Sequence, residues 1–118
     1  MNGQARTAVE LAEAGAVAWR QVVHAKQTAT PDHGDFYALA GELVDTLRSL
    51  EALAGLLARQ VATYGQGRVL RDDEGVDPAW RIAHAAELAG RVRDLVAGSE
   101  RLANQFWSEV GHVAVEVP

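Results

Sequence analysis

The chain has 118 residues, enough for one domain with its own core, and its lack of cysteine excludes disulfides, thiolate metal sites and thiol catalysis. Its formal charge of −5, from 16 acidic and 11 basic residues, disfavours a nucleic-acid partner, because proteins that bind the phosphate backbone carry basic patches. The N-terminus lacks a basic segment followed by an apolar core, and no run reaches the roughly 18 apolar residues of a membrane span. We therefore expect one acidic, cytoplasmic domain, 1–118, that does not bind membranes.

The first predicted helix spans about residues 5–28. Thr7 and Glu10 have the spacing of a capping box, although Asn2 offers an alternative cap for an earlier start. The helix must end before Pro31, because proline does not fit a helix interior. Its apolar face is built mostly from small residues, as expected of a helix that covers others: Val9, Ala12, Ala16, Trp19 and Val23.

The second predicted helix spans about residues 35–64 and follows a turn in which Asp32 or Asp35 can serve as the N-cap. Gly65 stands where a left-handed residue commonly ends a helix. A coiled-coil-like apolar stripe at alternating spacings of four and three residues runs for 29 residues, about 43 Å, and needs a partner to cover it. The stripe consists of Phe36, Ala40, Leu43, Leu47, Leu50, Ala54, Leu57, Val61 and Tyr64.

A loop of 13 residues, 65–77, follows and is longer than most connections between packed helices. Its acidic run, 72–74, departs from the pattern of calcium loops, so we expect it to be solvated. Asp77 followed by Pro78 is a helix start, because the carboxylate caps and proline suits the first helical position.

The third predicted helix spans about residues 78–110 and ends before Gly111. Three adjacent apolar rows make its face wide enough to contact more than one neighbour. The rows are Ile82, Ala89, Val96, Ala103 and Val110; Leu88, Leu95 and Leu102; and Ala85, Val92, Ser99 and Phe106. The tail, 111–118, alternates valine with other residues up to Val117, which predicts a short extended strand or docking strip.

These elements predict an all-α fold: a three-helix bundle built on a long antiparallel hairpin of the second and third helices, with a short extended C-terminal tail. The first helix or a second subunit would close the hairpin. Pairing of the tail with residues 68–71 would require an antiparallel dimer, because the two segments lie at opposite ends of one hairpin.

Four carboxylates suggest one enzymatic alternative. Glu10 and Glu13 form an ExxE pair, and Glu42 and Asp45 form an ExxD pair within the string Gly-Glu-Leu-Val-Asp-Thr-Leu. The two pairs resemble those of the MazG-type all-α nucleoside triphosphate pyrophosphohydrolases. The resemblance implies Mg²⁺ held by the four carboxylates, activating water and bridging the nucleotide phosphates.

The residues otherwise favour interaction over catalysis. We expect a non-enzymatic scaffold or regulatory module without a cofactor, which binds a protein partner or its own copy as a homodimer. The expected contact residues are charged, aromatic and valine side chains at the two ends of the hairpin. They are Arg68, Val69, Arg71, Trp80, Trp107, Val113 and Val115, with Trp107 equally suited to the core.

Overall fold

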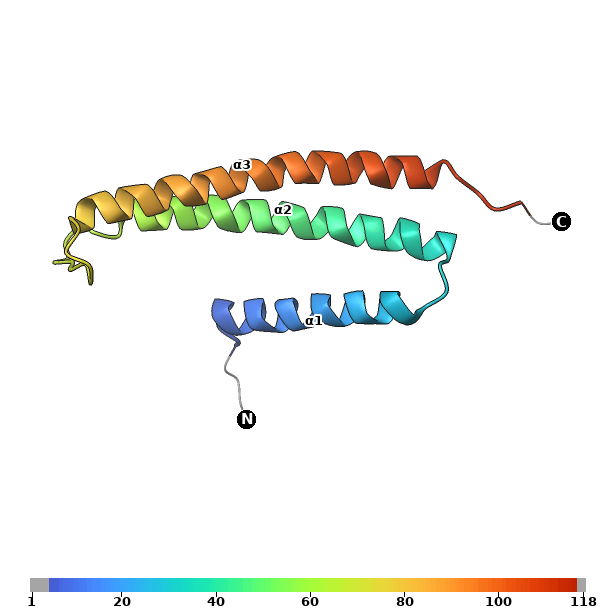
Figure 1. The fold of residues 1–118 in the computed structure, drawn as a ribbon, viewed down its shortest axis with the longest axis horizontal. Helices are drawn as coiled ribbons and strands as arrows, with labels where there is room; N and C mark the ends of the chain where they lie inside the picture. Colours follow the sequence, from blue (N-terminus) through green and yellow to red (C-terminus); the bar gives the residue numbers. More distant parts are fainter. Residues whose placement is uncertain (1–4, 117–118) are drawn as a thin grey trace. The chain divides into compact units, whose positions relative to one another are not determined.

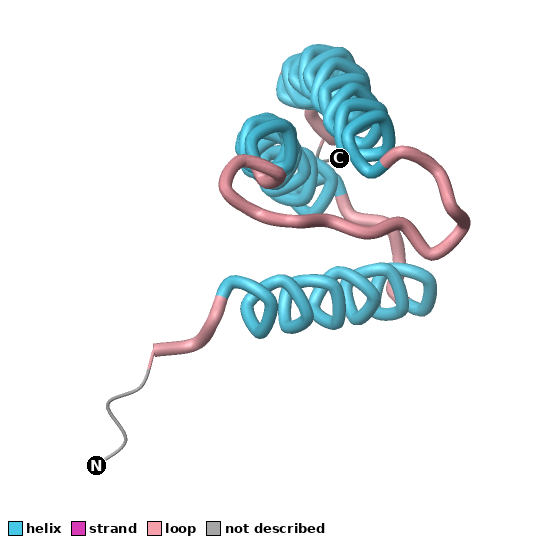
Figure 2. Tube along the Cα trace, turned by 90° about the vertical axis from the view of Figure 1, so that its left-hand side faces the viewer, coloured by secondary structure: helices cyan, strands magenta, loops and turns pink. Residues whose placement is uncertain are grey.

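The structure is a computed structural model that describes residues 5–116 of the chain (Figure 1). The described part contains three helices, α1 (Ala8–Thr28), α2 (His33–Thr63) and α3 (Pro78–Gly111), and no strand. The predicted all-α class is therefore confirmed. Figures 1 and 2 show α2 and α3 side by side and antiparallel, as expected for the hairpin. Closure of that hairpin by α1 or by a second subunit stays a prediction.

The capping box predicted at the start of α1 is present. The Thr7 backbone amide donates to Glu10 Oε1 at 2.8 Å, and the Glu10 amide donates to Thr7 Oγ1 at 3.1 Å. These bonds satisfy two amides that the first turn of a helix leaves without backbone partners. Asn2, the alternative cap, lies outside the described residues.

Helix α2 differs from its prediction at both ends. It begins at His33, directly after Asp32, because Gly34 takes a helical conformation. After Thr63 the chain continues through tight turns, in which the amides of Gln66 and Arg68 donate to carbonyls three residues earlier. The left-handed residue is consequently Gly67, with φ of 71°, and the expectation for Gly65 was wrong.

Helix α3 starts as predicted: Asp77 Oδ1 accepts from the Ala79 amide at 3.1 Å, and Pro78 occupies the first turn. It ends at Gly111, and the predicted tail strand does not form in the described residues 113–116. Val117 lies outside the described residues. The 31 residues of α2 and the 34 of α3 make a hairpin about 46–51 Å long.

The seam between α2 and α3 is built from small residues. Val44, at 1% exposure, is the largest side chain that the described structure buries completely. Small residues let two helix backbones approach closely, so this seam is tight but encloses little apolar volume. The buried residues of the hairpin are Ala40, Val44, Ala54, Gly55 and Ala103.

The apolar stripe predicted on α2 is divided by this packing. Its small members Ala40 and Ala54 are buried and Leu47 is half-buried, whereas Leu43 and Leu50 are exposed. The seam also includes Val44, one position beyond Leu43, because the helices contact along their small residues. About half of the predicted stripe therefore remains uncovered within the hairpin.

Two aromatic side chains, Tyr37 and Trp107, pack together at the end of the hairpin opposite the loop, and we call this contact the aromatic lock. The Trp107 indole lies against Gly41, where an added Cβ would be 3.1 Å from Trp107 Cζ2. The rings of Tyr37 and Trp107 are 5.7 Å apart, and a Cβ at Gly111 would be 3.0 Å from Tyr37. Glycine at positions 41 and 111 thus makes room for two large rings.

We expect Gly41→Leu to destabilise the hairpin by about 1–3 kcal/mol, because the leucine needs the space that Trp107 fills. Gly98→Leu is the matched control, since the nearest atom to a Cβ there is Nη2 at the far end of the Arg101 side chain, at 3.8 Å. Urea unfolding followed by circular dichroism measures both variants. Equal stability of the two variants would contradict the proposed lock.

Candidate functional site: an exposed apolar face on the hairpin

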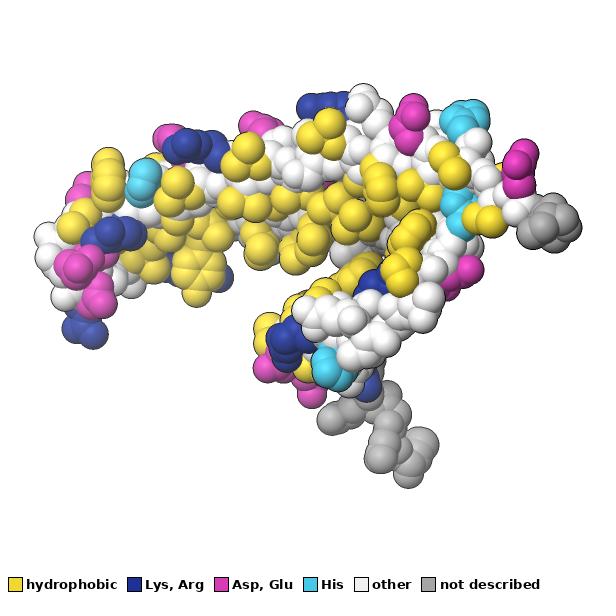
Figure 3. All heavy atoms as spheres, turned by 45° about the vertical axis from the view of Figure 1, so that its right-hand side comes forward, with side chains coloured by type: hydrophobic (Ala, Val, Ile, Leu, Met, Phe, Trp, Pro, Cys, Tyr) yellow, Lys and Arg dark blue, Asp and Glu magenta, His cyan; other side chains and the backbone are white. Residues whose placement is uncertain are grey.

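One long side of the hairpin carries large apolar side chains that the fold leaves exposed. Figure 3 shows hydrophobic side chains gathered in a band along α2 and α3. We call this surface the apolar face. Its members on α2 are Phe36, Leu43, Leu50, Leu53 and Leu57, Tyr64 follows directly after α2, and its members on α3 are Leu88, Val92, Leu95, Leu102 and Phe106.

The antiparallel geometry places these rows on the same side. On α2 the exposed Leu43 immediately precedes the buried Val44, and on α3 the exposed Leu102 immediately precedes the buried Ala103. One residue rotates a helix by about 100°. Because the two helices run in opposite directions, the residue that precedes a seam residue lies on the same side of the hairpin in both helices.

The rows of the apolar face contain no charged residue between positions 36 and 64, along α2 and the residue after it, or between positions 85 and 106 of α3. The other positions of these rows, at seven-residue spacing from the large members, are Leu39, Thr46 and Gln60 on α2, and Ala85 and Ser99 on α3. Charged side chains bridge the helices instead through Arg48, whose Nε lies 3.7 Å from Glu100 Oε1. The hairpin is therefore amphipathic as a unit and not only helix by helix.

The loop at the other end of the hairpin is held by Asp72. Its carboxylate accepts from Arg81 Nε at 2.8 Å and from the Glu74 and Val76 amides at 2.9 and 3.0 Å. Arg81 also donates to Glu74 at 2.9 Å. The Asp72 carboxylate thus binds two amides of its own loop and also connects the loop to the first turn of α3 through Arg81.

These contacts correct the expectation of a solvated acidic run for Asp72, whereas Asp73 and Glu74 are exposed as predicted. Only 7% of the Asp72 side chain is exposed, and hydrogen bonds from Arg81 and then from the Val76 amide hold the pKa of its carboxyl well below its usual range. The same ion pair raises the pKa of Arg81. In the described structure, carboxylate oxygens of Asp72, Asp73 and Glu74 come within 4.8 Å of one another, but Arg81 already forms ion pairs with two of these carboxylates, Asp72 and Glu74.

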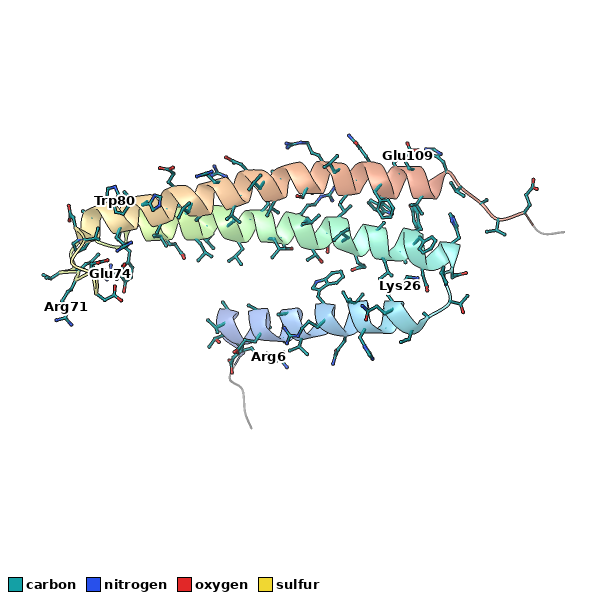
Figure 4. The ribbon with its side chains drawn as sticks, viewed as in Figure 1. Arg6, Lys26, Arg71, Glu74, Trp80 and Glu109 are labelled. Atoms are coloured by element: carbon teal, nitrogen blue, oxygen red, sulfur yellow. The ribbon has the colours of Figure 1, made fainter. Side chains whose placement is uncertain are left out.

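Four of the predicted contact residues gather at the loop end. Figure 4 shows Arg71 and Trp80 there, together with Glu74. The Arg68 guanidinium lies 4.2 Å from the centre of the Tyr64 ring, and Val69 is fully exposed. Trp80 is half exposed and stacks on His84 at 4.9 Å.

The other three predicted contact residues lie toward the opposite end. Val113 and Val115 are exposed on the tail. Trp107 is packed in the aromatic lock, and its Nε1 is buried, which favours a structural role over a contact role. The residues of the apolar face, which lies between the two ends, were not among the predicted contact residues. The sequence does contain a signal for this face, because its apolar rows include more large side chains than the seam covers.

The carboxylates of the enzymatic alternative are divided between α1 and α2. Glu42 and Asp45 are exposed on α2, and Glu13 is exposed on α1. Glu10 is engaged in the capping box, where hydrogen bonds from the Thr7 backbone and side chain lower the pKa of its carboxyl. The local structure thus gives Glu10 a role that requires no metal ion.

Comparison with known proteins gives no family: no family model, curated protein or solved structure matches the chain. Within residues 5–116, no helix is long and apolar enough to span a membrane.

We expect stability to fall in acid through Asp72. The pKa of its carboxyl in the folded protein lies below the reference value of 3.8, so the stabilisation is fully present above about pH 4 and is lost as the pH falls further. Asp72→Asn should make the loss of stability between pH 4 and pH 2 shallower. Urea unfolding at several pH values measures this slope. Asp73→Asn is the control, and an identical slope in both variants would contradict the role given to Asp72.

Proposed function

We propose that the protein is a non-enzymatic helical interaction module, of the scaffold or regulatory kind, which self-associates. Its working surface is the apolar face. The observation that carries this proposal is the combination of a thin internal seam with large apolar rows outside it.

The energetics support a covered face. Burial of apolar surface is worth about 25 cal/mol per Å², so exposed rows of leucine and aromatic side chains are a strong source of association energy. Contiguous exposed apolar patches of more than a few hundred Å² commonly mark contact sites. Aromatic residues at both ends, Phe36 on α2 and Tyr64 directly after it, suit the residue preferences of such interfaces.

We expect Leu95→Glu to reduce association through the face. Leu95 is 72% exposed, so the substitution leaves the seam intact while it places a charge in the apolar surface. Size-exclusion chromatography with light scattering measures the mass, and circular dichroism checks that helix content is retained. Ala52→Glu is the control, because Ala52 lies beside Arg48 and away from the face. Unchanged association of Leu95→Glu would contradict the use of this surface.

The enzymatic alternative makes an opposite prediction for divalent metals. An interaction module should melt at the same temperature with and without millimolar Mg²⁺ or Mn²⁺. A metal site at the four carboxylates requires stabilisation on binding, and Glu42→Gln should abolish it. Differential scanning fluorimetry of the wild type and Glu42→Gln decides between the two, because a metal-dependent shift that vanishes in the variant would contradict the interaction proposal.

A further inference from the structure

The row of the apolar face that runs along α2 and ends at Tyr64, the residue after the helix, has a symmetric order of side chains. An aromatic residue stands at each end, a leucine stands inside each aromatic residue, and one leucine stands in the middle, all at seven-residue spacing. The row is Phe36, Leu43, Leu50, Leu57 and Tyr64. Its sequence of side-chain sizes is therefore nearly the same in both directions, with Leu50 as the midpoint.

The α3 rows have their centre at the same level of the hairpin. Gly41 lies against Trp107, Gly55 lies against Arg93, and Arg48 pairs with Glu100, so residues at matching levels are fixed at three places. Interpolation between these contacts places Gly98 level with Leu50. Leu95 and Leu102 flank that level, three residues before it and four residues after it.

We infer that the apolar face binds the same face of a second copy, antiparallel, about a two-fold axis that lies between the copies at the level of Leu50. This inference rests on the proposed function and names the partner of that surface. Leu50 then meets Leu50 of the second copy, and Phe36 meets the second copy's Tyr64. On α3, Leu95 meets the second copy's Leu102. The product is a four-helix core made of two hairpins.

The exposed area suits a stable dimer. Eleven large apolar side chains, each about 40–70% exposed, leave on the order of 800 Å² on one chain, which is close to the roughly 800 Å² per partner of a standard stable interface. The exposed surface of the face is thus sufficient without a contribution from the loop or tail.

The absence of charge from the rows within the span of the face also favours a second copy. Charged groups usually steer and select a different partner protein, and these rows offer none there. A two-fold interface instead requires a surface that complements itself, with each residue and its counterpart matched about the axis. The order of the row from Phe36 to Tyr64, and the pair Leu95 and Leu102 on α3, meet that requirement.

The test uses opposite charges at the predicted axis in the full chain. We expect the wild type to have twice the 12.6 kDa mass of one chain, measured by light scattering over a range of concentrations. Leu50→Glu and Leu50→Arg should each weaken the dimer by about 100-fold, because like charges would meet at the axis. An equimolar mixture of the two variants should restore the dimer mass. The mixture of Ala52→Glu with wild type serves as the control for a charge outside the face.

A cysteine probe gives a second readout that does not depend on a charged variant. The chain has no cysteine, so Leu50→Cys introduces a single thiol, which should form an interchain disulfide on mild oxidation. Ala52→Cys should stay unlinked.

The outcomes separate the inference from the proposed function. A dimer that Leu95→Glu disrupts, but that neither links through Leu50→Cys nor is restored by the mixture, would keep the interaction face and overturn the antiparallel arrangement. A wild-type monomer at all concentrations would overturn the second copy as occupant and, with it, the self-association in the proposed function. The next experiments would then test whether the helix Ala8–Thr28 or a different protein covers the apolar face.

Discussion

The close approach of α2 and α3 along small side chains is the constraint on which the rest of the structure depends. Ala40, Ala54 and Ala103 are too short to hold the helices apart, so the seam is narrow, and Val44 is the largest side chain that it buries completely among the described residues. Most leucines of the two helices are left beside this contact, and Leu47 is half-buried at its margin. The thin seam and the broad apolar face are therefore two results of the same packing.

The parts of the fold that depend on neighbouring residues are readable from the sequence. The caps at Thr7 and Asp77 were predicted correctly because each is a contact within a single turn. The division of the α2 stripe was not predictable in the same way. A seven-residue pattern shows which side chains are apolar, but only the size complementarity between two helices decides whether Ala40 or Leu43 turns inward.

The loop shows that the roles of charged residues are also hard to predict from the sequence when they depend on distant contacts. The sequence shows an acidic run, and the role of Asp72 depends on a return of the chain that brings Arg81 within 2.8 Å. Likewise, two glycines, Gly65 and Gly67, both suit a left-handed end, and the extra tight turns decide in favour of Gly67. The ends of the hairpin were thus identified as candidate contact regions, whereas the face between them required knowledge of the seam.

The seat of Trp107 on Gly41 has a consequence for the alignment of the helices. A seam of repeated alanines looks nearly the same after a shift of one heptad, so alanine contacts alone discriminate poorly between alignments. A shift by one heptad in one direction would place the indole against Arg48. A shift by one heptad in the other direction would place it against Gly34, in the first turn of α2, and would separate Gly111 from Tyr37. The contact between Trp107 and Gly41 therefore fixes the register of the two helices. Through the register it determines which leucines of α2 and α3 stand level with one another on the outer surface.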